Sequence, residues 1–575
     1  MGLLSVPALW SPAMAGEVSP GLHKVLKAAE AEAAGAEVAV PVIISYRSES
    51  DPFALRKRLR TEERRFRRSA VPRTLQAETR DAGRDLRAMV EAIGGRNIRD
   101  LWIASSVSAE LTPAMIAEVL QQPDVIQVRQ DAMTASPFPM AGAPGAPEWN
   151  ISMVGAPELW NLGYLGGSVV VATLDTGADA LHPELAPSFR GGDNSWYDPY
   201  GEHATPYDRT GHGTQVLGLI VAGEGSGASL GVAPQARWIA AKIYDDAGNG
   251  TESAVHAAFQ WLLDPDGDPL TDDAPDVVNS SWGITDAGVC NTEFLPDIEA
   301  LKAADIAVVF SVGNSGPAPT TGESPGNNPG VLSVGAVDSL SEVAAFSSRG
   351  PSSCDDGLMP RLVAPGDSVQ TTDLSFGGMT NYVTVSGTSF AAPHVAGVLA
   401  LLRDAVPPAS VDELESVLFA SAVDLGTPGP DQDSGYGLVA ALAALNLLSY
   451  PVDVDGDGFS ASLDCNDTNA TIYPGAPERI RDGVDQDCNG YDLTIKVYQA
   501  VFSHDGGSLR LRVKSGYGDK AALEVVGVGP LTYRERYKDW YMNGGPVDGY
   551  ATPVITVRGI EGDIAVTPRK PLPKR

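Results

Sequence analysis

The feature that most constrains the fold is a series of continuous apolar runs between residues 148 and 449. The runs VVVATLD, WIAAKIY, DVVNSSWG, IAVVFSVGN and VLSVGAVD predict strands, and the amphipathic stretch ESAVHAAFQWLL predicts a helix among them. Strands that are apolar at every position are buried on both faces, which indicates a mostly parallel sheet with helices on both faces. We therefore predict an α/β domain whose site lies at the carboxyl ends of its strands.

Shorter patterned segments lie on either side of this domain. Residues 37–133 hold the strand-like runs VAVPVIISY and DVIQVRQD, and TPAMIAEVLQQP predicts a helix, so we expect a small α+β domain. Residues 134–147 are rich in Pro, Gly and Ala and predict an exposed, cleavable linker. Residues 493–566 alternate with period two between Gly-rich turns, which predicts a small antiparallel β domain before a tail at 567–575.

Charge is distributed unevenly along the chain. Residues 1–136 carry 18 Lys and Arg against 17 Asp and Glu, whereas residues 137–575 carry 23 against 56. An acidic body repels phosphate backbones and anionic lipid, so we expect no nucleic-acid partner, and membrane surfaces are poorer candidate partners than divalent cations. No run of 18 apolar residues occurs, so we expect no transmembrane segment. An apolar run with an A-x-A-like sequence at 13–15 makes residues 1–36 an export leader without a basic start, and we expect a secreted monomer.

One basic segment stands out in the α+β domain. We interpret RKRLRTEERRFRR, residues 56–68, as a solvated helix face or loop, and a binding or processing site is the less favoured alternative. If this segment faces the acidic residues of 137–575, its positive charge would attract them, although physiological salt largely screens that electrostatic attraction.

Three motifs place polar residues at the ends of predicted elements. VVVATLDTGADALHPEL ends a buried strand on Asp175, RTGHGTQVLGLIVAG opens a helix with His212, and SGTSFAAPHVAG opens another helix with Ser389. A serine hydroxyl needs a neighbouring base, and an imidazole titrates near neutral pH, so the three predict nucleophilic catalysis. His394 lies five residues after Ser389 and about 140° around the helix, so we assign it a structural role and make His212 the base.

Together with VGNSG, these motifs resemble those of the subtilisin-like serine proteases over about 300 residues, in the chain order Asp, His, Ser. The resemblance implies Ser389 as nucleophile, His212 as general base and acid, Asp175 as the carboxylate that orients His212, and Asn314 as the side-chain donor of the oxyanion hole. The backbone N–H of Ser389 and the positive end of its helix would stabilise the same oxyanion.

Side chains beside these motifs are expected to pack rather than react. Gln215 and Phe390 stand where the family often has His and Met, and Phe390 is expected to alter packing near the site. His182 resembles a structural histidine of the family. His256 lies on a predicted amphipathic helix face and is interpreted as a packing or surface residue.

Substrate contacts follow from the same resemblance. NSSWG resembles the segment whose backbone pairs with an extended peptide as an added strand, a mode that accepts many sequences. No acidic residue directly follows Asn314, where Ser315 stands, so we predict broad specificity with a leaning to apolar P1 side chains. The implied substrate-binding residues are Ser281, Trp282, Gly283 and Gly313.

The α+β domain resembles the inhibitor-like propeptide of these proteases. The likeness is greatest over LTPAMIAEVLQQPDVIQVRQD, and the Arg-rich segment departs from the pattern. The resemblance implies a zymogen whose own propeptide assists folding, acts as intramolecular inhibitor with its tail in the site, and is cut off within residues 134–147. The partners would be protein and peptide substrates.

A metal site is predicted in residues 451–492. DVDGDGFSASLD fits the EF-hand loop pattern, and DQDCNGYD adds a half-motif. Hard oxygen ligands at this spacing favour Ca²⁺, and the stretch resembles a short calcium-binding module of secreted bacterial proteins. A flexible acidic linker is the alternative, and a further Ca²⁺ in the catalytic domain stays open. The expected ligands are Asp453, Asp455, Asp457, Phe459 through its carbonyl, Asp464, Asp485, Asp487 and Asn489.

Four cysteines without CxxC spacing argue against a zinc ribbon or a thioredoxin-like site and favour disulfides. The likeness to the calcium-binding module implies a bridge between Cys465 and Cys488. A bridge between Cys290 and Cys354 stays open, because the distance between them cannot be derived from the sequence.

The leading hypothesis is a secreted serine endopeptidase made as a zymogen. The alternative is a calcium-dependent binding protein that uses an inactive protease fold, and the four intact residues of the motifs argue against it. Acid-active relatives with Glu in place of His do not fit, because GHGT supplies a histidine. The role of the terminal β domain stays open.

Overall fold

The computed structural model forms two compact units, residues 1–449 and residues 450–575, which are considered separately. The described residues of the first unit are 16–32, 38–137, 140–141, 149–223, 229–284, 286–375 and 378–449. In the second unit the described residues are 465–466, 469–473, 476, 479, 484–486, 488, 493–502, 509–516, 523–525, 529–534, 536–544, 555–559, 562–566 and 568. Within the described residues, no helix has the length and apolar character needed to cross a bilayer.

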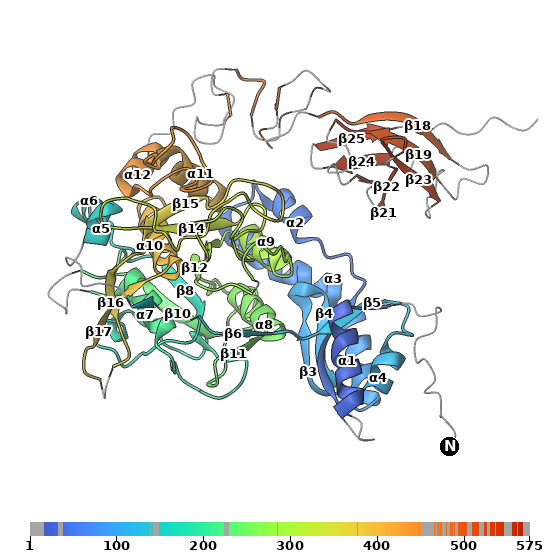
Figure 1. Cartoon of the computed structure of the whole chain (residues 1–575), viewed down its shortest axis with the longest axis horizontal. Coiled ribbons are helices and arrows are strands. Elements are labelled where there is room, and N and C mark those ends of the chain that lie inside the picture. The colour runs from blue at the N-terminus through green and yellow to red at the C-terminus, as the bar shows by residue number, and fades with distance from the viewer. Residues whose placement is uncertain are drawn as a thin grey trace, which may run out of the picture. The chain divides into compact units, whose positions relative to one another are not determined.

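A seven-stranded sheet forms the centre of the first unit (Figure 1). Its strand order is β15-β14-β13-β12-β8-β10-β9, and every neighbouring pair is parallel, as predicted. From β8 the chain moves to one side for β10 and to the other for β12, so the topological switch point lies beside β8. The strands are β8 (Val170–Asp175), β9 (Trp196–Tyr197), β10 (Arg237–Lys242), β12 (Val277–Ser280), β13 (Ala307–Ser311), β14 (Leu332–Val337) and β15 (Leu362–Pro365).

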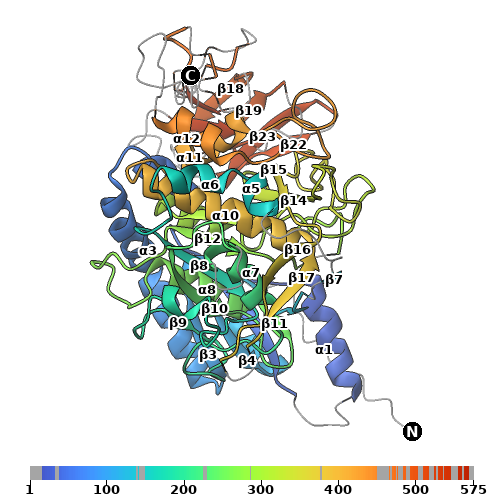
Figure 2. The ribbon, with the colours of Figure 1, turned by 90° about the vertical axis from the view of Figure 1, so that its left-hand side faces the viewer.

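Helices cover both faces of this sheet. Figure 2 shows the face that is covered by α7 and α10. Val171 and Val277 belong to the apolar cluster on one face, whereas Ala172 and Val278 belong to the cluster on the other. Successive strand residues are therefore all buried, which explains the continuous apolar runs. The helices on the first face are α5 (Trp149–Met153), α6 (Ala156–Asn161), α7 (His212–Val221), α10 (Thr388–Ala405), α11 (Val411–Ser421) and α12 (Ala441–Ser449). The helices on the second face are α8 (Glu252–Leu263) and α9 (Leu295–Ala303). A short 3₁₀ turn, η2 (Ala186–Ser188), follows β8.

The N-terminal part is an α+β domain with a five-stranded sheet of order β1-β5-β2-β4-β3. Residues 16–32 are expected in the leader, but the structure places them in this domain. Leu22, Val25 and Leu26 follow helical spacing, and Leu22 and Leu26 are buried in its core. The elements are β1 (Glu17–Val18), α1 (Pro20–Glu32), β2 (Val40–Tyr46), α2 (Pro52–Leu59), α3 (Arg64–Ala92), β3 (Arg96–Leu101), η1 (Trp102–Ala104), β4 (Ser106–Leu111), α4 (Pro113–Val119) and β5 (Val125–Gln130).

The interpretation of the Arg-rich segment as a solvated face is wrong for four of its arginines. Arg67 and Arg68 are 3% and 6% exposed, and the side chains of Arg56 and Arg64 are 22% and 26% exposed. Their guanidinium groups meet carboxylates and carbonyls of the sheet domain, which no local pattern could indicate.

The predicted linker contributes two short strands to the sheet domain. β6 (Met133–Ala135) pairs antiparallel with β11 (Asn249–Thr251). β7 (Met140–Ala141) pairs antiparallel with β17 (Tyr382–Ser386), which also pairs with β16 (Val369–Thr372). The predicted linker thus adds one strand to each of two small antiparallel sheets, which are separate from the seven-stranded sheet.

The second unit is antiparallel throughout its described pairings, as predicted, with two four-stranded sheets. Leu511 of one sheet and Val557 of the other share one apolar cluster. The strands are β18 (Lys496–Phe502), β19 (Leu509–Lys514), β23 (Asp539–Gly544) and β22 (Thr532–Arg534), then β21 (Gly529–Pro530), β20 (Glu524–Val525), β24 (Ile555–Gly559) and β25 (Gly562–Val566).

Candidate active site

Asp175 and His212 form a buried pair at the carboxyl end of β8. His212 Nδ1 donates to Asp175 Oδ1 over 2.8 Å. His212 is 0% exposed and Asp175 is 1% exposed. The hydrogen bond from Nδ1 leaves Nε2 with its lone pair available. His212 Nε2 and Asp175 Oδ2 are buried and have no hydrogen-bond partner among the described residues. The pair therefore presents an oriented imidazole whose outer nitrogen is ready to accept a proton.

Glycine and threonine bring the two motifs of this pair together. A Cβ on Gly213 would lie 2.1 Å from the Gly177 carbonyl oxygen, so only glycine permits this approach of α7 to the loop after β8. The Gly213 N–H donates to Thr176 Oγ1 over 2.9 Å. The local sequences DTG and GHGT thus close on each other in space.

Asp208 is a positioning residue that the sequence analysis missed. Its Oδ1 accepts from Thr176 Oγ1 over 3.0 Å, and its Oδ2 accepts from the Thr214 N–H and Oγ1 over 2.9 and 2.7 Å. Asp208 therefore joins the loop after β8 to the first turn of α7 and caps that helix. An acidic residue four positions before His212 was the only sequence signal for it.

Ser389 is the second residue of α10 and is 6% exposed. Its Oγ donates to the Ser281 carbonyl over 3.3 Å, and Ser281 Oγ donates to the Ser389 carbonyl over 2.7 Å. These reciprocal contacts hold the start of α10 against the end of β12. Gly387, just before the helix, has φ +152°, a conformation that favours glycine. The nucleophile candidate is thus fixed at a helix N-terminus, where an oxyanion is stabilised.

Asn314 lies beside this helix start with its amide nitrogen available. Its Oδ1 accepts from the Thr388 N–H over 2.8 Å and from Thr388 Oγ1 over 3.0 Å. Thr388 Oγ1 also accepts from the Gly313 N–H over 3.2 Å. Since Oδ1 is held on the protein side, Nδ2 is the atom left to donate to a substrate oxygen. Thr388 is a second positioning residue that the sequence analysis missed.

The four predicted substrate-binding residues lie on two neighbouring segments, after β12 and after β13. Ser281 is fully buried, and the Trp282 side chain lies in the apolar core, edge-on to Phe310 at 5.3 Å between ring centroids. Only the backbone of these two residues is therefore left for a peptide. Gly283 and Gly313 both lie beside the carboxylate of Glu323.

Glu323 was not among the predicted site residues. A Cβ on Gly283 would lie 2.7 Å from its Oε2, and a Cβ on Gly313 would lie 2.9 Å from its Cδ, so both glycines make room for this side chain. Burial raises the pKa of Glu323, and a hydrogen bond from Ser315 Oγ at 3.4 Å partly opposes the rise. The described residues contain no cation paired with it.

His394 has the structural role predicted for it. Its Nδ1 donates to the Phe390 carbonyl over 2.8 Å, and its Nε2 accepts from Asn150 Nδ2 over 2.8 Å. Burial lowers the pKa of His394 to about 4, so the ring is neutral near pH 7. Phe390 packs against the Asp175–His212 pair, with its ring centroid 5.5 Å from that of His212.

His182 and His256 also lie in buried, hydrogen-bonded positions. His182 is fully buried, and its Nδ1 accepts from the Glu184 N–H over 3.2 Å. His256 lies between Asp297, 2.9 Å from Nδ1, and Glu293, 3.0 Å from Nε2. Burial disfavours the charged ring, but the charge of Asp297 and its hydrogen bond raise the pKa of His256 to about 10. His256 is thus a buried ion-pair member rather than a simple packing residue.

The predicted metal ligands lie mostly outside the described residues. Of the eight, only Asp485 is described; Asp453, Asp455, Asp457, Phe459, Asp464, Asp487 and Asn489 are not. The predicted bridge between Cys465 and Cys488 is present. Cys290 and Cys354 form a second bridge, which the sequence left open.

Comparison with known proteins supports the same class of site. A family model described as the subtilase family, Peptidase S8, matches residues 166–437. A second model, the metal-binding motif called Cu-binding MopE, matches residues 464–492. The first range contains the catalytic candidates, and the second contains part of the predicted metal site.

Three relatives are similar to the chain over more than half of its length. Bacillopeptidase F of Bacillus subtilis (strain 168) is 34% identical over 435 residues, which are 68% of this chain but only 30% of that protein. Subtilisin E of the same organism is 32% identical over 336 residues, 58% of this chain and 79% of that protein. The thermostable alkaline protease of Halalkalibacterium halodurans is 31% identical over 343 residues, covering 58% and 81%.

Proposed function

The chain belongs to the subtilase family of serine endopeptidases, and we propose that it cleaves extended polypeptides through an acyl-enzyme formed on Ser389. The hydrogen-bonded Asp175–His212 pair at the carboxyl end of β8 is the observation that carries this proposal. The Ser389 hydroxyl proton passes to His212 Nε2 as Oγ attacks the scissile carbonyl. Asp175, which accepts from Nδ1, stabilises the imidazolium. His212 then gives the proton to the leaving amine, and water repeats the sequence to release the acid.

The oxyanion would be bound by Asn314 Nδ2 and the Ser389 backbone N–H. Support comes from Thr388, which engages the other end of the Asn314 amide, and from the position of Ser389 in the first turn of α10. Donors fixed in advance stabilise charge that develops in the transition state without reorganisation.

We further propose that the chain is a zymogen whose linker crosses the catalytic centre. The Ser136 N–H donates to the Gly248 carbonyl over 2.8 Å, beside β11, and Met140 pairs with Ser386, three residues before Ser389. β11 is connected to the end of β8 through Ile243. A Cβ on Gly250 would lie 3.0 Å from the Ile243 carbonyl oxygen, and the Ile243 N–H donates to the Asp175 carbonyl over 2.9 Å. Residues 138 and 139 are outside the described residues. We expect the cut at one of the four bonds between Ser136 and Met140.

One experiment tests both proposals. Full-length chain should process itself and release a mature form whose N-terminus is one of residues 137–140, as determined by N-terminal sequencing. Casein cleavage by that form should stop with a serine-directed covalent inhibitor. Cleavage that continues at an undiminished rate after inhibitor treatment would contradict the mechanism. Inhibitor-insensitive or absent cleavage by processed protein would instead favour a binding protein on an inactive protease fold.

Two expectations about P1 specificity now compete. The residue after Asn314 is Ser315, which favours apolar P1 side chains. Glu323, between Gly283 and Gly313, favours a basic P1 side chain when its carboxylate is charged. Peptide-library profiling of the mature enzyme distinguishes them.

We propose that the matched metal-binding segment takes Ca²⁺ rather than copper. Residues 464–492 contain no histidine or methionine, and Cys465 and Cys488 are joined to each other, so the usual soft ligands of copper are missing. Asp and Asn oxygens are ligands that Ca²⁺ prefers. Titrating the full-length Ser389→Ala chain by calorimetry should give Ca²⁺ binding that a chelator reverses, and copper binding without Ca²⁺ binding would contradict this. Export and a monomeric state stay predictions from the sequence.

A further inference from the structure

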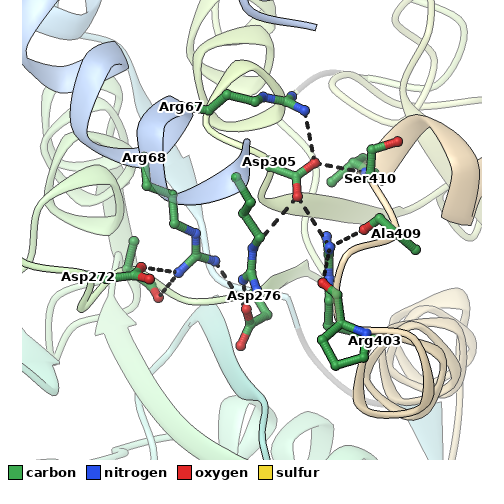
Figure 3. A network of polar contacts seen from close by, with 12 residues as sticks. Arg67, Arg68, Asp272, Asp276, Asp305, Arg403, Ala409 and Ser410 are labelled. Carbon is green, nitrogen blue, oxygen red and sulfur yellow. Dashed lines mark hydrogen bonds and ion pairs between the residues drawn. The ribbon is translucent and has the colours of Figure 1, made fainter. Parts of the chain in front are cut away.

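The segment between α8 and β12, residues 264–276, carries six aspartates, and two of them lie against an arginine. Arg68 of α3 lies 2.9 Å from Asp272 Oδ1 and 3.1 Å from Asp276 Oδ1. Figure 3 shows its guanidinium directed between these two carboxylates. Asp276 directly precedes β12, at the amino edge of the parallel sheet, which is the opposite end of the strands from the candidate active site. The aspartates nearest to the sheet are thus neutralised by the protein itself.

Three of the other aspartates form a cluster. One side-chain oxygen from each of Asp264, Asp266 and Asp273 lies within 4.8 Å of those of the other two. Among the described residues, the ion pairs of this segment are those of Asp272 and Asp276, so none of the three clustered carboxylates has a cationic partner there. Carboxylates this close repel one another, and the repulsion is relieved by a proton or a cation.

Asp264 is the buried member of the cluster. It is 9% exposed, and neither of its side-chain oxygens has a hydrogen-bond partner among the described residues. Burial and the charges of Asp266 and Asp273 raise the pKa of Asp264 to about 6, while the Gln76 amide of α3 partly opposes the rise. Asp264 also follows the last residue of α8, where the helix dipole disfavours a negative charge and favours a positive one. Its surroundings therefore call for a cation.

Arg190 approaches the cluster, but its donors are used elsewhere. Its Nε donates to Ser195 Oγ over 2.9 Å, and its Nη1 and Nη2 donate to the Asp273 and Asn194 carbonyls. The Asn194 amide in turn donates to Asp273 Oδ2 over 2.7 Å. These contacts fix the position of Asp273 without an ion pair to any of the three carboxylates.

A second cluster in the catalytic domain shows how the protein can neutralise such a group itself. Side-chain ligand atoms of Glu202, His203 and Asp246 lie equally close together. Lys242, which is 1% exposed, places its Nζ 3.2 Å from an oxygen of both Glu202 and Asp246. The described residues offer the Asp264 cluster no such ammonium group.

We propose that Asp264, Asp266 and Asp273 form a Ca²⁺ site that joins the end of α8 to the segment before β12. Carboxylate oxygens are the ligands that Ca²⁺ prefers, and their spacing lets one ion contact all three at the roughly 2.3–2.6 Å of a Ca²⁺–oxygen bond. Mg²⁺ gives up its water reluctantly, so it is less suited to a site with a buried ligand. The site belongs to the first unit, whereas the metal-binding segment at 464–492 belongs to the second.

A bound ion should hold the exposed part of this segment in place. Asp266 is exposed, and its carboxylate accepts from the Asp268 N–H over 2.8 Å and from Thr271 Oγ1 over 3.0 Å, so it already organises its own turn. An ion shared with Asp264 and Asp273 would tie that turn to the end of α8. Because an exposed loop must open locally before a protease can cut it, Ca²⁺ should protect residues 265–272.

Limited proteolysis measures this protection directly. The full-length Ser389→Ala chain is freed of metal with a chelator, dialysed, and treated with an unrelated protease that needs no Ca²⁺, with and without CaCl₂. At a Ca²⁺ concentration about ten times the dissociation constant, cutting within residues 265–272 should slow about 10-fold, because a ligand of the closed form lowers the open population by that factor. Mass spectrometry locates the cuts, so the readout is separate from catalysis by the chain and from Ca²⁺ binding at 464–492.

A matched pair of variants shows whether the cluster is responsible. Asp264→Asn should lose the protection by Ca²⁺, and in chelator it should melt no lower than the parent, because it relieves the repulsion among the carboxylates. Asp85→Asn removes the same charge from a side chain of α3 that is 73% exposed, and it should keep the 10-fold protection. Equal protection of the two variants would overturn the proposal, and so would a parent chain that Ca²⁺ does not protect.

A third variant covers the case in which Asp264→Asn does not fold. Asp266→Asn changes an exposed side chain and keeps an oxygen that can accept from Thr271. It should lose most of the protection, and full protection in this variant, with an unchanged circular dichroism spectrum, would also overturn the proposal. MgCl₂ in place of CaCl₂ should protect the parent less, and equal protection by the two salts would overturn the assignment to Ca²⁺.

Discussion

Both ends of the parallel sheet bury carboxylates, but the carboxylates at the two ends differ in whether all their oxygens have partners. At the amino edge, every side-chain oxygen of Asp276 and Asp305 has a partner. The partners are Arg64, Arg67 and Arg68 of α3, Arg403 at 3.2 Å, and the Val170 and Val411 N–H groups. At the carboxyl edge, Asp175 Oδ2 and His212 Nε2 are buried and have no partner among the described residues.

This difference separates a structural from a reactive use of buried charge. A fully paired carboxylate contributes to stability and holds its neighbours in one arrangement, whereas a buried carboxylate oxygen without a partner costs free energy unless substrate or chemistry uses it. The comparison predicts that substitutions at the carboxyl edge change rate more than stability, and that substitutions at the amino edge do the reverse.

The largest expected effect is that of Ser389→Ala at the carboxyl edge. Loss of the nucleophile should lower turnover by several orders of magnitude, an effect on the order of 10⁶-fold in subtilisin, a relative of this chain. Gel electrophoresis should then show uncut precursor, while the melting temperature stays close to that of the unsubstituted precursor. Normal maturation of this variant would mean that another protease makes the cut.

Asn314→Leu should have the next largest effect. The variant should fold but turn over on the order of 100- to 1000-fold more slowly, the loss measured in subtilisin, a relative of this chain, when one oxyanion donor is removed. Michaelis–Menten kinetics on a peptide substrate should place the loss in kcat and leave KM close to its original value. Near-normal kcat would remove Asn314 from the oxyanion hole.

The sequence indicated which elements carry the polar side chains of the carboxyl edge, because that information is local. Asp175, His212 and Ser389 each end a buried strand or begin a helix, and parallel topology brings such ends together. The glycines of DTG and GHGT are needed for close approach within those same short segments. The supporting residues Asp208 and Thr388 were missed, because a single acid or threonine has many uses.

The amino edge could not be predicted, because its pairs are distant in sequence. Arg67 and Asp305 are 238 residues apart, and no pattern near either one indicates the other. The cluster of arginines was therefore interpreted as solvated, as most such clusters are. The same reason hid Glu323, since its contact with Gly283 depends on how two loops meet.

The amino edge gives the third prediction, now in stability. Asp305→Ala leaves Arg67 and Arg403 buried without their shared carboxylate and should lower the free energy of unfolding by roughly 3–5 kcal/mol. Denaturant unfolding in the Ser389→Ala background, which prevents self-digestion, measures the loss. Asp193→Ala, at an exposed position, is the matched control and should change little. A loss for Asp305→Ala no larger than for the control would mean that the paired edge is not stabilising.

The smallest effect concerns Glu323, a carboxylate beside Gly283 and Gly313 that has no cationic partner among the described residues. Because burial raises its pKa above the usual range, the carboxylate becomes charged only as pH rises through that raised value. The ratio of kcat/KM for a lysine P1 peptide to that for a leucine P1 peptide should therefore increase with pH. In Glu323→Gln the ratio should fall about 10-fold at high pH and lose its pH dependence, whereas Glu342→Gln at an exposed position should leave it unchanged. A leucine preference that neither pH nor Glu323→Gln alters would instead support the apolar P1 side chain predicted from Ser315.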